Sequence, residues 1–184
     1  MAQAIPRSLL RRWFSGLTEH AFLCELGIGD PALTDYLAEM LCRFLHMDQI
    51  YRLRDATGRQ LDEVASMLIE AEGLPPEGRT RREIHRHIGD FTLFWTGLFP
   101  EALQQHRRRS ELDFFVDYCN QGKRSYLIAA AYDGEPYRDE SPVLRRLSEE
   151  FELCALGLNK VRAELHQGGT SDPSSGLWLQ GDDA

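Results

Sequence analysis

The sequence predicts an all-α fold, an irregular single-domain bundle of six to seven helices, and three observations support that prediction. Apolar residues recur at spacings of three and four through most of the chain. The alternation typical of a half-buried strand is hard to find. Helix-start and helix-stop signals divide the chain into segments of ordinary helix length.

The first predicted helix begins at Pro6 and runs to Leu17, with its apolar residues on one side. The pattern continues through Cys24, so one bent helix or two short helices fit the sequence before Gly27 stops it. A second helix is predicted from residue 31 to about residue 46, because an aspartate followed by proline is a good helix start.

Two further helices are predicted on either side of the loop at residues 73–78. The first covers residues 59–72. The second covers residues 80–99 and opens with a capping box formed by Thr80 and Glu83. Its apolar stripe is continuous, so this helix is expected to be mostly buried.

Ser110 is predicted to cap a helix over residues 111–132, and Ser141 to cap a final helix that ends near residue 167. The final helix carries the most regular apolar seam of the chain, formed by Leu144, Leu147, Phe151, Cys154, Leu158, Val161 and Leu165. Such a seam is typical of a long helix laid in a bundle groove. The same seam could form a homodimer, although a cysteine and a phenylalanine are poor zipper residues.

The chain is predicted to divide into a helical domain, residues 1–167, and a flexible C-terminal tail, residues 168–184, because the composition becomes small and polar after Gln167. Leu177, Trp178 and Leu179 form one apolar triplet in this tail. The triplet either folds back on its own domain or docks on another chain.

Composition and charge indicate which partners and which cellular compartment to expect. The net charge of −8 disfavours non-specific binding to nucleic acid or to anionic membranes. No apolar run is long enough for a spanning helix, and no signal peptide is recognised. The four cysteines form no CxxC pair and lie in apolar stretches, which predicts four buried thiols in a reducing compartment. Cytoplasmic localisation is therefore expected.

Three polar residues on one flank of helix 80–99 form the first candidate site. Glu83, His87 and Asp90 follow a spacing of four and three, so they share one side of the helix. Such a trio suits one metal ion or a histidine tuned as a base. The alternative is a satisfied histidine at the boundary of the core. His85 is predicted to point away from the apolar stripe, into solvent.

Two glycines inside predicted helices indicate where helices meet. Glycine in a helix costs about 1 kcal/mol relative to alanine, and close approach of a neighbouring helix offsets that cost. Gly89 and Gly122 therefore predict that helices 80–99 and 111–132 pack at short distance. The alternative is a ligand pocket between these helices, lined by Glu83, His87, Asp90, Lys123 and Tyr126.

No motif in the chain indicates a cofactor. Dinucleotide, P-loop, nucleophile-elbow, zinc-protease and EF-hand patterns are not found, and no second Glu-x-x-His motif supports a di-metal bundle. Arginine clusters occur, but acids outnumber bases 29 to 21, so ion pairs are expected rather than nucleic-acid binding.

The segment GDFTLFWTGLFPE at residues 89–101, with DYCNQGKRSY at residues 117–126, resembles a group of uncharacterised bacterial helical proteins. That group carries a GDxxLFxxGxFPE-like box and a downstream GKxxY-like segment. The resemblance implies a bacterial origin and a helical fold, and it implies no activity, ligand or partner.

These features favour a helical interaction or scaffold domain that binds itself or another protein. Homodimerisation through the final helix or through the glycine-lined faces is the specific expectation. The alternative is a small enzyme or ligand-binding protein that uses the pocket between helices 80–99 and 111–132.

Overall fold

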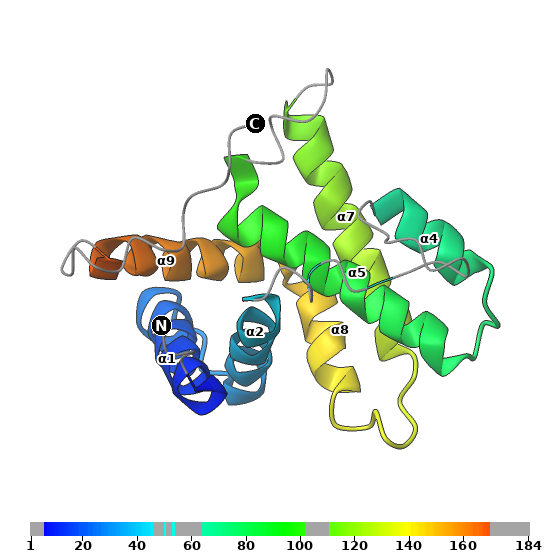
Figure 1. Cartoon of the computed structure of the whole chain (residues 1–184), viewed down its shortest axis with the longest axis horizontal. Coiled ribbons are helices and arrows are strands. Elements are labelled where there is room, and N and C mark those ends of the chain that lie inside the picture. The colour runs from blue at the N-terminus through cyan, green and yellow to red at the C-terminus, as the bar shows by residue number, and fades with distance from the viewer. Residues whose placement is uncertain (1–5, 46–49, 51–52, 54–63, 102–110, 170–184) are drawn as a thin grey trace, which may run out of the picture.

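The computed structural model describes residues 6–45, 50, 53, 64–101 and 111–169. Within these residues the chain forms seven α-helices and one π-helical segment and no strand, which confirms the all-α prediction (Figure 1). The elements are α1 (Arg7–Glu19), η1 (His20–Glu25), α2 (Pro31–Phe44), α4 (Val64–Glu72), α5 (Arg79–Leu98), α7 (Glu111–Ala130), α8 (Ser141–Glu149) and α9 (Phe151–Gly169). No helix of the described chain has the length and apolar character to cross a membrane.

Helix α5 runs through the middle of the molecule, with α7 and α9 packed against it, while α1 and α2 lie side by side next to α9 (Figure 1). Fourteen of its twenty residues are buried, so polar residues of α5 must find partners inside the bundle. Buried side chains from all parts of the described chain join in one hydrophobic core.

Glycines allow the helices around α5 to approach closely. A Cβ at Gly89 would lie 2.6 Å from the ring of Tyr126 on α7. A Cβ at Gly122 of α7 would collide with Thr92 of α5 and with Phe151 of α9. The predicted close packing of these two helices is therefore confirmed, and the space that the glycines leave is filled by side chains.

The observed first residues of α2 and α5 can be compared with the predicted N-caps. Asp30 caps α2, because its Oδ1 accepts a hydrogen bond from the backbone N–H of Leu33 at 3.2 Å. The predicted capping box at Thr80 and Glu83 is wrong. Helix α5 already begins at Arg79 behind Gly78, without a side-chain cap, so Thr80 lies within the first turn.

The predicted final helix is two helices, since the backbone leaves the helical region at Glu150 (φ −111°, ψ 29°) between α8 and α9. The seam from Leu144 to Val161 is nevertheless fully buried inside the bundle. This seam and the glycine-lined faces, the two surfaces expected to form a homodimer, both already pack within one chain.

Several predictions fall on residues outside the described ranges. These are the cap at Ser110, the start of the helix at residues 59–63, and the tail with Leu177, Trp178 and Leu179. Of the four cysteines, which are all described, three are buried as predicted and Cys24 is exposed.

Candidate functional site

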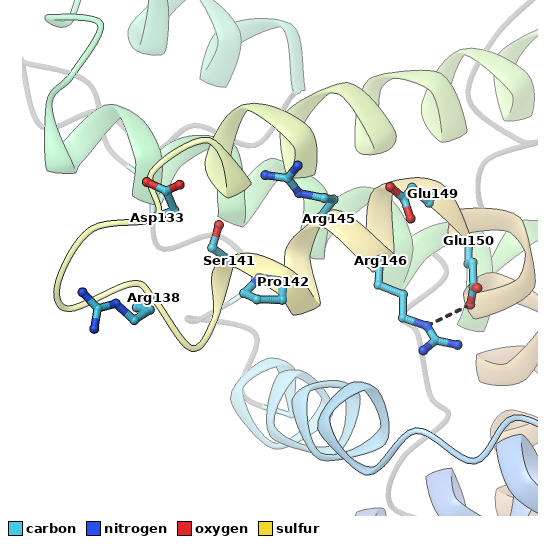
Figure 2. Close-up of a pocket in the computed structure, with 8 residues that line it drawn as sticks. All are labelled: Asp133, Arg138, Ser141, Pro142, Arg145, Arg146, Glu149 and Glu150. Atoms are coloured by element: carbon cyan, nitrogen blue, oxygen red, sulfur yellow. Dashed lines mark hydrogen bonds and ion pairs between the residues drawn. The ribbon is translucent and has the colours of Figure 1, made fainter.

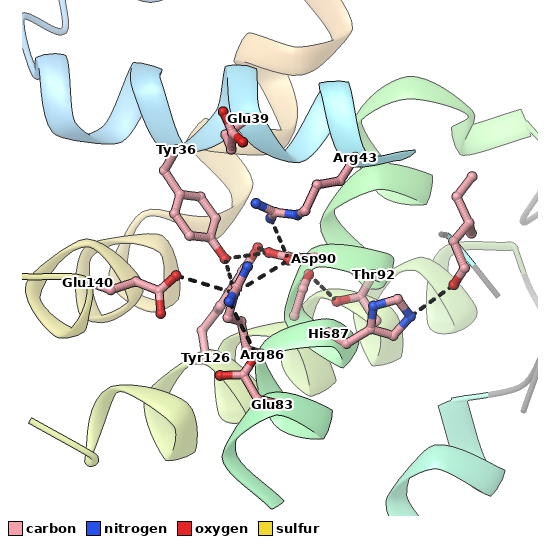
Figure 3. A network of polar contacts seen from close by, with 12 residues as sticks. Tyr36, Glu39, Arg43, Glu83, Arg86, His87, Asp90, Thr92, Tyr126 and Glu140 are labelled. Atoms are coloured by element: carbon pink, nitrogen blue, oxygen red, sulfur yellow. Dashed lines mark hydrogen bonds and ion pairs between the residues drawn. The ribbon is translucent and has the colours of Figure 1, made fainter. Parts of the chain in front are cut away.

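Asp90 lies near the middle of α5 with 2% of its surface exposed, and three side chains from other helices bind it (Figure 3). Its Oδ1 accepts hydrogen bonds from the hydroxyl groups of Tyr36 on α2 at 2.7 Å and Tyr126 on α7 at 2.9 Å. Its Oδ2 accepts a hydrogen bond from Nη2 of Arg43 on α2 at 3.0 Å. One carboxylate therefore ties three helices together.

The charge of Asp90 is compensated inside the bundle. Burial alone would raise the pKa of this carboxyl group, but Arg43, Arg86 and the Tyr36 hydroxyl group together hold it below its usual value. Burial and the neighbouring carboxylate raise the pKa of both tyrosines well above the ordinary value. Both hydroxyl groups therefore keep their protons and remain hydrogen-bond donors to Asp90.

Ion pairs continue this network toward the surface. Arg86 lies 4.0 Å from Asp90 Oδ2, 3.2 Å from Glu83 Oε2 and 3.3 Å from Glu140 Oε1. Arg82 is fully buried; it pairs with Glu83 and Glu140, and its guanidinium carbon lies 3.7 Å from the centre of the Tyr137 ring. The predicted ion pairs of this arginine cluster are thus present, and they join α5 to the start of α8.

The predicted trio on α5 does not converge on one point. Glu83 pairs with arginines, Asp90 binds the two tyrosines, and His87 hydrogen-bonds through Nε2 to the backbone carbonyl of Ile50 at 2.9 Å. His87 is 1% exposed and packs edge-on against Phe44. These contacts match the alternative of a satisfied core histidine more closely than a metal site or a base.

The predicted pocket residues on α7 have different roles. Tyr126 points to Asp90 as expected, but its ring fills the space beside Gly89. Lys123 forms an ion pair with Glu152 of α9 at the surface of the bundle instead of lining a cavity with Asp90. The three donors hold the Asp90 carboxylate in place between the helices, which is the geometry of a structural centre.

His85 was expected in solvent but is buried, with 4% of its surface exposed. It lies one turn before Gly89, on the face of α5 that packs against α7, and this packing covers it. Among the residues that the structure describes, neither ring nitrogen has a hydrogen-bond partner. Burial, with additional repulsion from Arg81 and Arg124, lowers the pKa of His85 to about 4.

A shallow depression of about 630 Å³ lies along α8 (Figure 2). Its lining consists of Asp133, Arg138, Ser141, Pro142, Arg145, Arg146, Glu149 and Glu150. Three acids and three arginines share it, and Arg146 already pairs with Glu150 at 3.3 Å and with Asp30 at 2.7 Å. The depression therefore has no excess charge with which to select an ion.

A second group of metal-ligand side chains lies between η1 and α9. His20 and Glu25 of η1 and Glu164 of α9 have ligand atoms within 4.8 Å of one another. His20 Nδ1 lies 2.7 Å from Glu164 Oε1, and Glu25 Oε2 lies 2.8 Å from Lys160 Nζ. The hydrogen bond and charge of Glu164 raise the pKa of His20.

The sequence predicts Asp90 and one of its partners, Tyr126, but not the other two, Tyr36 and Arg43. Tyr36 and Arg43 are separated by seven residues, so they share one face of α2, and this spacing was an available signal. No comparable signal joins His20 to Glu164, which is 144 residues away. A scan against protein-family models, a search of curated proteins and a search of solved structures each found no match to this chain.

Proposed function

We propose that this protein is a helical interaction domain that self-associates through the outer face of α1. Leu9 and Trp13 lie one turn apart on α1 and are 57% and 52% exposed. When a partner covers two neighbouring large apolar side chains, their apolar surface is removed from water, and this burial favours association. Arg7 and Arg11, on a neighbouring face, are paired with Glu39 of α2, so their charges are partly neutralised.

Gly16 is the observation that carries the proposal. It continues the spacing of Leu9 and Trp13 at the next turn, and a Cβ built there would meet no atom of the described residues within 4 Å. Gly89, Gly97, Gly122 and Gly157, the helical glycines of α5, α7 and α9 with described contacts, each accommodate a side chain of a neighbouring helix. Gly16 lowers the stability of its helix in the same way, but within the described chain no neighbouring helix packs against it to offset that loss.

A second copy of the chain is the occupant that fits this face. In a two-fold dimer each residue of the patch meets its counterpart from the other copy. Two antiparallel α1 helices can place Leu9 of one copy against Trp13 of the other, and the bare backbone at Gly16 lets them approach closely. The filled core between α5 and α7 favours this binding function over the ligand pocket.

Sedimentation equilibrium of the full chain tests this proposal. The wild type is expected to show a reversible monomer–dimer equilibrium. Trp13→Ser should weaken association about tenfold or more, because a central aromatic residue contributes more than about 1.4 kcal/mol at an interface. Gly16→Gln should also weaken association, while it stabilises the isolated helix by roughly 0.5–1 kcal/mol.

Ile69→Ser is the matched control. Ile69 is 72% exposed on α4, away from α1, so this variant should associate like the wild type. A wild type that stays monomeric at every concentration would contradict self-association. So would a Gly16→Gln variant that is more stable and associates as tightly as the wild type.

A further inference from the structure

We propose that His20, Glu25 and Glu164 form a binding site for a divalent transition-metal ion, with zinc as the preferred ion. The three side chains come from η1 and α9, and their ligand atoms lie within 4.8 Å of one another. In a tetrahedral zinc site with bonds near 2.1 Å, ligand atoms are about 3.4 Å apart. Small side-chain rotations are therefore enough to bring the three onto one ion.

The π-helical geometry of η1 is what makes this arrangement possible. In an α-helix, residues five apart point about 140° away from each other. The i→i+5 hydrogen bonding of a π-helix brings such residues toward the same side, so His20 and Glu25 can both face α9. Single π-helical turns are rare and occur frequently at functional sites.

Close packing holds the two elements at the distance that the site requires. Phe22 of η1 is fully buried against Gly157 of α9, where any Cβ would collide with its ring. This contact fixes η1 against α9 about two turns before Glu164. The ligand side chains remain partly open to solvent: 55% of the His20 side chain is exposed, 31% of Glu25 and 25% of Glu164. A water molecule or an external ligand can therefore take the fourth position.

The donor set selects the class of ion. One imidazole nitrogen and two carboxylate oxygens suit zinc and its neighbours in the first transition row, whereas calcium and magnesium prefer oxygen ligands alone. The two carboxylates neutralise a divalent charge. Lys160 disfavours metal binding, because its positive charge repels a cation. Its ammonium pairs with Glu25 Oε2, so Oε1 of Glu25 is the oxygen left to bind the metal.

Zinc titration of the full, untagged and reduced chain by isothermal calorimetry tests the site. We expect saturation at one ion per chain, and a cobalt complex with visible absorption bands. His20→Ala, Glu25→Gln and Glu164→Gln should each weaken binding about tenfold or more, because a three-ligand site loses a ligand. Lys160→Met should strengthen binding, since it removes the competing cation. Each substituted side chain is at least partly exposed, and circular dichroism checks that the variants remain folded.

Two controls separate this site from other donors. His166→Ala removes an exposed histidine of α9 outside the cluster, and Cys24→Ser removes the exposed thiol within η1; both should leave zinc affinity unchanged. Loss of binding in Cys24→Ser would overturn the assignment in favour of a thiol site. Equal affinity in the wild type, His20→Ala and Glu25→Gln would show that the ion binds elsewhere, and no zinc binding by the wild type would reject the site outright.

Discussion

The buried charge of Asp90 is stabilised by partners that approach from two directions. Tyr36 and Tyr126 both donate to Oδ1, while Arg43 donates to Oδ2. A buried carboxylate without partners would cost several kcal/mol, so each donor contributes more than an ordinary surface hydrogen bond. Asp90 therefore connects α5 to both α2 and α7.

Tyr126→Phe removes one donor and leaves the ring that packs on Gly89. Because a hydrogen bond to a charged group contributes about 1.5–3 kcal/mol, we expect the free energy of unfolding to fall by about 2 kcal/mol. Urea denaturation monitored by circular dichroism measures this change. Tyr132→Phe is the control, since Tyr132 is only half-buried and donates an exposed hydrogen bond to the carbonyl of Pro76; it should change stability by less than about 0.5 kcal/mol. Equal effects of the two substitutions would contradict the role assigned to Asp90.

At the residue scale, the sequence indicated that Asp90 needs partners and identified only one of them, Tyr126. A polar residue on the flank of a strongly apolar helix indicates a compensated charge. Local spacing placed His87 and Glu83 beside Asp90, whereas the structure adds Tyr36 and Arg43, which lie 54 and 47 residues away in the sequence. Such pairings follow from how the helices pack, and a single sequence contains no direct record of that packing.

At the scale of helices, replacing a glycine by alanine should lower stability in α5 and raise it in α1. Gly89→Ala places a Cβ 2.6 Å from the Tyr126 ring, which is fully buried and held by Asp90. Overpacking of this kind costs about 1–3 kcal/mol, so the variant should be less stable despite the better helix propensity of alanine.

Gly16→Ala is the comparison, because the added Cβ meets no neighbouring atom in the part of the chain that the structure describes; this variant should raise stability by about 1 kcal/mol. Thermal unfolding at a protein concentration where the chain is monomeric measures both variants. If both alanines shift the unfolding temperature in the same direction, the close approach at Gly89 is not rigid.

The sequence predicted which helices meet but not where the chain departs from α-helical geometry. Glycine inside apolar helices correctly indicated that α5 and α7 pack closely, because a missing Cβ has a simple steric consequence. The π-helical turn of η1 and the break at Glu150 have no such marker: neither contains proline or glycine. Both depend on how the flanking helices pack, so the apolar pattern continues through them unchanged.

At the scale of the whole molecule, His85 should make stability fall in mild acid. Its pKa is about 4 in the folded chain against an ordinary 6.5, because the buried ring resists protonation. The unfolded chain takes up a proton as the pH falls below about 6.5, and the folded chain does so only near pH 4. Stability is therefore full above pH 6.5 and is lost progressively toward pH 4, by about 3 kcal/mol.

Urea denaturation of the wild type and of His85→Leu between pH 7 and pH 4 measures this loss. The variant should lose less stability over that range, since it has no ring to protonate. Asp90 acts in a separate window: its lowered pKa means that its contribution is lost only below about pH 4. Parallel curves for the two proteins between pH 6.5 and pH 4 would exclude His85 as the cause.

The central position of α5 also has a consequence for how the chain is made. It contacts α2 through Asp90, α7 through Gly89 and α9 through Gly97, so no contiguous half of the sequence contains a complete core. On the ribosome, α5 emerges long before α9 is synthesised. Its apolar surface must therefore remain uncovered, or bound to a chaperone, until α9 has been synthesised.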